Sequence, residues 1–173
     1  ISWLGAFRVQ LSWDFTSAVT PSTIGGAPMA TYAMTKEGLR LGESTAIILY
    51  SVLLDQIWFA IAIPILFVTG IYVDVIPPSV GFIGEVSMLI LYISLLSYAG
   101  VLAYGVLIKP SAISKIIKWF AKLPFLRKYR DKIHSEAASL EQYAYQLKVK
   151  PFHFLLRAFF YSTMSWLARV ALA

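Results

Sequence analysis

Three ionisable side chains lie inside long apolar stretches of this 173-residue sequence, where packing alone does not explain them. Asp55 falls near the middle of the stretch 46–70, whereas Arg157 and Arg169 fall within the stretch 152–173. A charge at the centre of a bilayer costs about 2.5–3.5 kcal/mol on insertion scales, so such residues usually face protein or water and mark a functional pathway. The position of Asp55 therefore suits a proton relay or a contact with a cationic lipid headgroup.

Each of these charges also has a structural interpretation. Asp55 could form an ion pair with an arginine of a neighbouring helix, for which Arg8, Arg157 and Arg169 are the candidates. Arg157 lies one turn into its stretch, so its long side chain could snorkel to the membrane interface. Arg169 could reach the opposite interface if its helix tilts, or it could point inward to a lipid phosphate. The sequence leaves these alternatives open.

Other kinds of chemistry find little support in the residue types. The chain has no cysteine, which excludes a disulfide framework and a thiolate metal site. The two histidines, His134 and His153, have no partner at metal-ligand spacing, so we expect surface side chains. No nucleophile elbow or glycine-rich nucleotide loop is present. We therefore expect no catalytic residue, no metal site and no cofactor.

The composition and its distribution predict helices that span a membrane. The chain is 58% hydrophobic and 14% charged, against about 25% charged in an ordinary soluble domain. About 20 apolar residues in a helix cross the hydrocarbon core of a bilayer. Residues 46–70 and 86–108 meet this length outright, and residues 152–173 form a third span that is cut short. Residues 1–20 mix polar and apolar side chains and predict the end of a membrane helix. The fold class expected is an all-α integral membrane protein, a polytopic helix bundle.

Basic residues set the expected orientation, because loops rich in Lys and Arg stay in the cytoplasm. The loop 109–151 contains ten of the fifteen basic residues, and the loop 71–85 contains none. The loop 109–151 is therefore predicted to be cytoplasmic. Two amphipathic helices are expected within it. The first carries Ile113, Ile116, Ile117, Phe120 and Leu123 with lysines between them, and the second, after Pro124, carries Ile133, Ala137, Leu140, Ala144 and Leu147 on one face. The first helix suits the anionic surface of the inner leaflet.

The segment 21–38 is predicted to be a broken or re-entrant piece of helix. Pro21 ends the preceding helix, and Pro28 fits the first turn of the next one. Gly25 and Gly26 permit unusual backbone angles. Broken backbone at membrane depth is tolerated where it lines a wet cavity, and the start of a helix there would attract a phosphate. A tight surface loop between two helices is the alternative.

The same residues resemble a known family. The pattern Thr20-Pro21-Ser22-x-x-Gly25-Gly26-x-Pro28, followed by Tyr32, Gly38 and Ser44-Thr45-Ala46, is similar to the lysylphosphatidylglycerol synthetase transmembrane (flippase-like) family. The later Ser165-Trp166-Leu167 agrees with the family's next span. The resemblance covers essentially the whole chain, which it indicates is an internal fragment of a longer protein.

The resemblance implies a multi-pass protein of the bacterial inner membrane that moves a phospholipid or a lipid-linked headgroup between leaflets. The alternative is the membrane portion of an aminoacyl- or glycosyl-transferase, whose transfer chemistry would lie in a separate domain. The expected partners are the bilayer and a phospholipid with an anionic or zwitterionic headgroup, and a homo-oligomer is left open. Nucleic acid is not expected, because the positive-inside rule already explains the lysines.

The headgroup-binding residues predicted in this way are Pro21, Ser22, Gly25, Gly26, Pro28, Asp55, Gln56, Arg157 and Arg169. One position departs from the family pattern. Family members often have an arginine after the acidic residue of this helix, and here Gln56 follows Asp55. If that arginine contacts a lipid phosphate in the family, the headgroup specificity of this chain differs.

Overall fold

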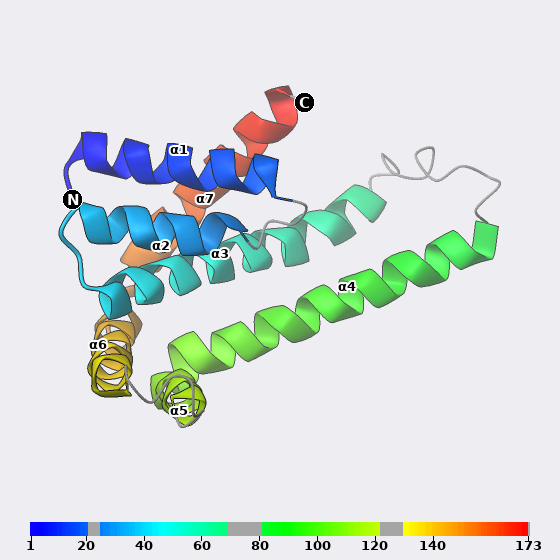
Figure 1. The fold of residues 1–173 in the computed structure, drawn as a ribbon. Coiled ribbons are helices and arrows are strands. Elements are labelled where there is room, and N and C mark those ends of the chain that lie inside the picture. Colours follow the sequence, from blue (N-terminus) through cyan, green and yellow to red (C-terminus); the bar gives the residue numbers. More distant parts are fainter. Residues whose placement is uncertain (21–24, 69–80, 122–129, 173) are drawn as a thin grey trace. The chain divides into compact units, whose positions relative to one another are not determined.

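The computed structural model describes residues 1–20, 25–68, 81–121 and 130–172, and its regular elements there are all helical, as predicted (Figure 1). They are α1 (Trp3–Val19), α2 (Gly26–Lys36), α3 (Leu41–Val68), α4 (Gly81–Ala103), the π-helical turn η2 (Tyr104–Ile108), α5 (Pro110–Phe120), α6 (Arg130–Lys148) and α7 (Phe152–Leu172). The chain divides into two compact units. Unit 1 comprises residues 1–50 and 105–149, and unit 2 comprises residues 51–104 and 150–173. Each unit is described by itself.

Two helical segments have the length and hydropathy of membrane spans. Leu41–Val68 and Gly81–Ile108 each have 28 residues and a mean hydropathy of 2.0. At about 1.5 Å per residue, each exceeds the roughly 30 Å of a bilayer core. Both begin five residues before the predicted spans. In the first turns of α3 the hydroxyls of Ser44 and Thr45 donate to the carbonyls of Arg40 and Leu41, at 2.9 and 2.8 Å, so these polar side chains are satisfied within the helix.

The third predicted span corresponds to α7. It is a continuous helix of 21 residues, but among the described helices only the two segments above meet the length and hydropathy of a span. Arg157 and Arg169 lower the hydropathy of α7. Its passage through a membrane therefore stays a prediction.

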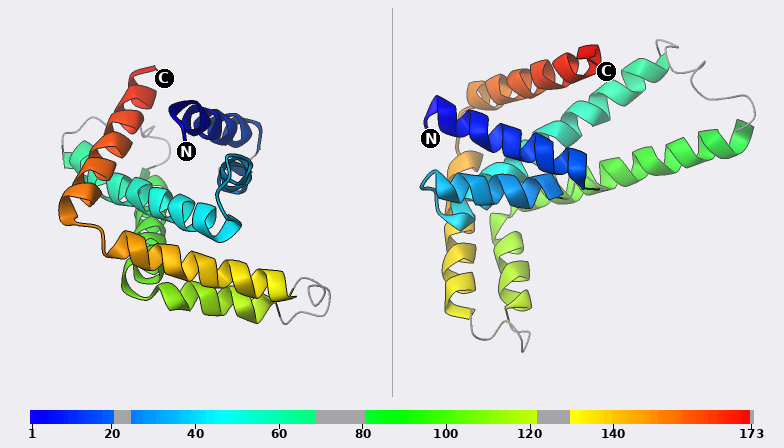
Figure 2. Two further views of the ribbon diagram at one scale, coloured as in Figure 1. Left: turned by 90° about the vertical axis from the view of Figure 1, so that its left-hand side faces the viewer. Right: turned by 45° about the horizontal axis from the view of Figure 1, so that its top comes forward.

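Helices α1 and α2 pack side by side in unit 1 (Figures 1 and 2). Helix α1 ends at Val19, just before Pro21, and Pro28 lies in the first turn of α2, as the sequence predicts. Helix α2 ends in a Schellman motif. Gly38 adopts a φ of +96°, its amide donates to Thr35, and the amide of Leu39 donates to Met34, both at 3.2 Å.

Gly25 and Gly26 do not use the unusual backbone angles that the sequence suggested. Gly25 has a φ of −69°, and Gly26 is helical; the described glycines with positive φ are Gly38 and Gly81. Both positions instead lack room for a side chain. A Cβ on Gly26 would collide with the Ser17 hydroxyl and lie 3.1 Å from the Trp13 ring. Gly26 therefore allows α2 to approach α1 closely.

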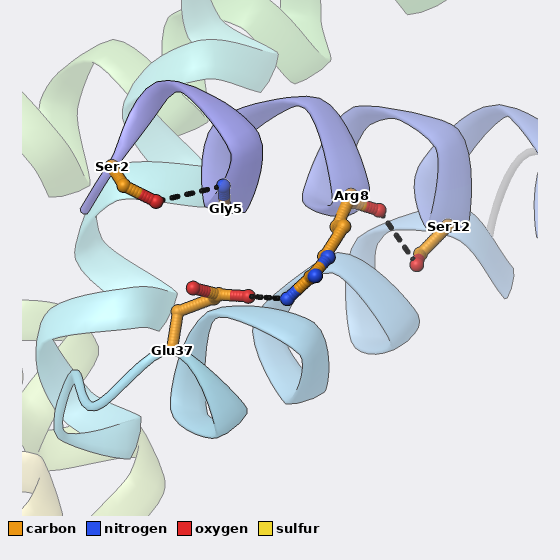
Figure 3. Close-up of polar contacts among 5 residues, drawn as sticks. All are labelled: Ser2, Gly5, Arg8, Ser12 and Glu37. Atoms are coloured by element: carbon orange, nitrogen blue, oxygen red, sulfur yellow. Dashed lines mark hydrogen bonds and ion pairs between the residues drawn. The ribbon is translucent and has the colours of Figure 1, made fainter.

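Polar contacts also join the two helices at their other end (Figure 3). The Ser2 hydroxyl caps α1 by accepting from the amide of Gly5 at 3.1 Å. Arg8 of α1 forms an ion pair with Glu37, the residue that caps α2, at 3.5 Å. Arg8 is exposed, so this pair contributes little to stability. It does explain how one charged residue of the first helix is accommodated.

Helices α5 and α6 form a second pair in unit 1 (Figure 2). Ala137, Leu140 and Ala144 of α6 are buried, as the predicted amphipathic face requires. Leu140 and Ala144 form a cluster with Ala46 of α3, and Ile113 and Ile117 of α5 pack against it. Of the predicted first amphipathic helix, Leu123 lies outside the described residues.

A proline shapes the contact between α3 and α4 in unit 2. Pro64 has no backbone N–H, so the carbonyl of Ala60, four residues earlier, lacks its usual partner within the helix. The Tyr92 hydroxyl of α4 donates to this carbonyl at 3.0 Å. Buried polar groups in a membrane need such partners, because lipid offers none. The bond therefore lets α3 keep a proline within its last two turns.

Candidate functional site

Asp55 lies near the middle of α3 and is held by two side chains of α7. Its carboxylate oxygen Oδ1 accepts a hydrogen bond from the Ser162 hydroxyl at 2.7 Å and another from the indole N–H of Trp166 at 2.9 Å. Ser162 and Trp166 are four residues apart, so they occupy one face of α7. The side chain of Asp55 is half-buried. A carboxylate thus stands inside a membrane helix with neutral hydrogen-bond donors around it.

Aromatic rings surround the donor side of this carboxylate. Trp58 stacks on Trp166 with 5.6 Å between ring centroids and an interplanar angle of 17°. Phe59 meets Trp166 edge to face at 4.6 Å. Trp58 of α3 and Trp166 of α7 thus pack against each other between the two helices. The two hydrogen bonds are partly buried beside these rings.

Two of the three arginines proposed as structural partners of Asp55, Arg157 and Arg169, lie with it in unit 2. Within residues 51–68, 81–104 and 150–172 of unit 2, no ion pair joins Asp55 to an arginine. The guanidinium of Arg169 instead lies 5.0 Å from the centroid of the Trp166 ring, a cation–π distance. Arg157 is exposed, which agrees with snorkelling but does not establish it. The hydrogen-bond donors to this carboxylate in the described part of the unit are therefore the neutral side chains of Ser162 and Trp166.

The other predicted residues are placed as follows. Gln56 is half-buried on α3, and no hydrogen bond of its side chain is found among the described residues. Gly25, Gly26 and Pro28 form the start of α2 in unit 1, so they belong to a different unit from Asp55. Pro21 and Ser22 lie outside the described residues.

An apolar groove also occurs in unit 2, between α3 and α4. Its volume is about 230 Å³, and it is lined by Ile63, Leu66, Phe67, Met88, Leu91, Tyr92 and Leu95. The polar atom of Tyr92 is already bonded to Ala60. No predicted headgroup-binding residue lines the groove, so it does not support a phosphate site there.

Sequence reasoning identified Asp55 as a site residue but missed both of its donors, Ser162 and Trp166. One signal was available: Ser162 and Trp166 are hydrogen-bond donors at i and i+4 of a helix that is otherwise largely apolar. Such spacing suggests a shared acceptor on another helix. Nothing in the sequence indicates that Asp55, 107 and 111 residues away, is that acceptor.

Two helices long and apolar enough to cross a bilayer, with a hydrogen-bonded carboxylate in one of them, are typical of a helical membrane protein. Comparison with known families agrees: the model of the lysylphosphatidylglycerol synthase TM region matches residues 1–173. The chain belongs to this family, which confirms the resemblance found in the sequence.

A curated relative supports the same class. A UPF0104 membrane protein of Archaeoglobus fulgidus is 29% identical over 133 residues, which are 76% of this chain and 37% of the relative. The chain therefore spans just over a third of the length of this relative. No solved structure matches the chain significantly.

Proposed function

We propose that these residues belong to a lipid-translocating domain of the bacterial inner membrane, one that moves a phospholipid or a lipid-linked headgroup between leaflets. The observation that carries the proposal is the carboxylate of Asp55, which is held in the middle of a membrane helix by Ser162 and Trp166. Membership of the family supports the membrane setting. The orientation in which residues 109–151 are cytoplasmic is part of the proposal and rests on their basic charge.

The hydrogen bonds fix the carboxylate without cancelling its charge. Two neutral donors stabilise an ionised oxygen, whereas an arginine would neutralise the pair. An uncancelled charge in a low-dielectric setting attracts a cation strongly. Asp55 would therefore contact the cationic part of a passing headgroup, or carry a proton in exchange for it. The rings of Trp58, Phe59 and Trp166 would keep water from competing.

The other predicted residues lie in two different units, and each set is proposed separately as a contact for the lipid phosphate. Arg157 and Arg169 supply positive charge on α7. The start of α2 offers backbone amides and the positive end of a helix dipole, and Gly25 caps it without a side-chain hydrogen bond. Gly26 and Pro28 belong to this helix start, Pro21 and Ser22 lie outside the described residues, and Gln56 would replace the arginine of the family pattern.

The test is lipid scrambling by the full-length protein in reconstituted vesicles, measured by dithionite reduction of a fluorescent phospholipid. Asp55→Asn keeps the size of the side chain and an oxygen acceptor, so it removes the charge while preserving the hydrogen bonds. We expect at least a tenfold loss of translocation by a protein that remains folded. Asp131→Asn, an exposed acid on α6, is the matched control and should behave as the parent. Equal translocation by the Asp55→Asn protein would refute the role of this carboxylate.

A further inference from the structure

Helix α5 has more apolar surface than its neighbours bury. One face of the helix carries buried Ser114 and the half-buried Ile113 and Ile117, which pack against the α3–α6 cluster. The side chains of Ile116, Trp119 and Phe120 remain 56%, 62% and 49% exposed. These three positions are spaced i, i+3 and i+4, so they form a single apolar face. We call it the α5 face.

Helix α6, its partner in the pair, shows the opposite character. Its exposed positions are mainly polar or charged, and Tyr145 is the large apolar exception within the helix. They include Asp131, Lys132, Ser135, Gln142 and Gln146. The surface of α6 is therefore suited to water, and the surface of α5 is not. This contrast within one helical pair indicates that the α5 face meets an apolar phase.

The charges beside the α5 face are positive. Lys115 is exposed next to Ile116 and one turn before Trp119, and Lys109 is exposed just ahead of the helix. Helix α5 contains no acidic residue. Lys118 differs from these lysines, because its ammonium group lies 4.0 Å from the carboxylate of Glu141 on α6. A face with aromatic and aliphatic residues flanked by lysines is typical of helices that lie in the interface of anionic membranes.

The short connection to the preceding membrane-spanning segment places α5 at such an interface. Helix α5 begins at Pro110, two residues after Ile108 ends the second membrane-spanning segment. The turn between them is fixed within unit 1. Lys148 of α6 donates to the carbonyl of Ile108 at 3.0 Å, and Gly105 leaves room for the side chain of Ile113.

We propose that the α5 face docks into the headgroup region of a bilayer that contains anionic phospholipid, with Ile116, Trp119 and Phe120 inserted and Lys115 and Lys109 at the phosphates. Charge complementarity and the adjoining membrane span select a lipid surface over a protein partner. This binding surface does not depend on lipid translocation or on Asp55.

The absence of cysteine from these residues makes a site-directed label practical. We would replace Ile116 with cysteine in the full-length protein, and Gln142 in a matched control on α6, and attach a nitroxide to each. Accessibility to oxygen and to a water-soluble nickel chelate would be compared in detergent, in phosphatidylcholine vesicles and in vesicles with 30 mol% phosphatidylglycerol. We expect the label at residue 116 to become oxygen-accessible and nickel-protected in the anionic vesicles, while the label at residue 142 stays nickel-accessible.

Two outcomes would overturn the proposal. A label at residue 116 that stays nickel-accessible in every vesicle would show that the face is in water. Spin–spin broadening that rises with protein content, or protection from both reagents, would show a second copy or another protein segment on the face.

Charge substitutions test the lipid chemistry separately. Lys115→Gln should weaken the docking of the α5 face about fivefold, because each basic residue near the surface contributes roughly that factor to binding, and the fraction of phosphatidylglycerol needed for half-maximal protection should rise. Lys132→Gln on α6 is the control and should leave the fraction unchanged. Equal behaviour of the two variants would refute the contact of Lys115 with phosphate. Translocation activity is not the readout, so failure here and failure of the proposed function are distinguishable.

Discussion

The backbone amide of Gly42 donates to the carboxylate of Glu136 at 2.8 Å, although the two residues are 94 positions apart. The amide lies in the first turn of α3, where backbone N–H groups lack partners within the helix. A carboxylate there also interacts favourably with the helix dipole. Space at this point is very limited: a Cβ on Gly42 would collide with the carbonyl of Glu136 and lie 2.6 Å from the amide of Leu140. Helix α3 is therefore joined to α6 through backbone contact.

Gly42→Ala should consequently destabilise unit 1. The atoms in the way belong to the backbone of α6, so they cannot rotate aside, and overpacking of this kind typically costs about 1–3 kcal/mol. The measurement is thermal unfolding of the purified protein in detergent, followed by circular dichroism. Gly100→Ala is the matched control, because a Cβ there meets no atom within 4 Å and alanine favours a helix. A Gly42→Ala protein as stable as the Gly100→Ala protein would contradict the close crossing.

The sequence pattern Gly38-x-x-x-Gly42 shows how far reading from the sequence could go. The spacing matches a helix-dimer motif, but the segment is charged, which does not favour that motif. In the structure the two glycines serve unrelated purposes. Gly38 ends α2 with a positive φ, which could be predicted from glycine at a helix end. Gly42 admits the backbone of α6, which could not be predicted because that contact depends on tertiary structure.

The rest of the fold and the site likewise divide into features that local sequence predicts and contacts that depend on tertiary structure. The apolar runs, the proline and glycine positions and the spacing of Leu140 and Ala144 predicted the helices, because these signals are local. The contacts of Asp55 were not predictable. Serine is common in this sequence, and a hydrogen bond over more than 100 residues leaves no local trace.

The contribution of the Tyr92–Ala60 hydrogen bond to stability should depend on Pro64. Tyr92→Phe removes the donor, and polar contacts between membrane helices contribute about 0.6 kcal/mol on average and about 1.7 kcal/mol at most. Pro64→Ala restores an N–H that can satisfy the Ala60 carbonyl within α3. In the Pro64→Ala background we therefore expect Tyr92→Phe to have almost no effect on unfolding. The full cost of Tyr92→Phe in both backgrounds would refute the compensation.

The role of Gly26 can be separated into packing and binding. Gly26→Ala should destabilise the α1–α2 pair, because the added methyl group meets the Ser17 hydroxyl. Ser17→Ala removes that oxygen, which is buried and has no partner among the described residues, so the double variant should recover most of the stability. Thermal unfolding of the three variants measures this.

Lipid translocation by the Gly26→Ala/Ser17→Ala protein is the second readout. An alanine at the start of α2 keeps the backbone amides that the proposed phosphate site needs. Recovery of stability together with translocation would assign Gly26 to packing alone. Recovery of stability without translocation would show that the helix start is also needed by the lipid.

The indole of Trp166 should matter because of its N–H and not only because of its ring. Trp166→Phe keeps an aromatic surface for Trp58 but leaves the Asp55 carboxylate with Ser162 as its remaining donor. Hydrogen bonds to charged groups contribute about 1.5–3 kcal/mol, so we expect a loss in that range in the free energy of unfolding. Trp3→Phe, at a residue 94% exposed, is the control and should be neutral.

A double-mutant cycle then assigns the loss to the hydrogen bond. Asp55→Leu removes the acceptor, and the N–H of Trp166 is then left without a partner in an apolar setting. In that background Trp166→Phe removes an unsatisfied donor, so it should be neutral or stabilising in denaturant unfolding. If Trp166→Phe destabilises both backgrounds equally, the ring contributes through packing with Trp58 and Phe59, and the hydrogen bond to Asp55 contributes nothing measurable.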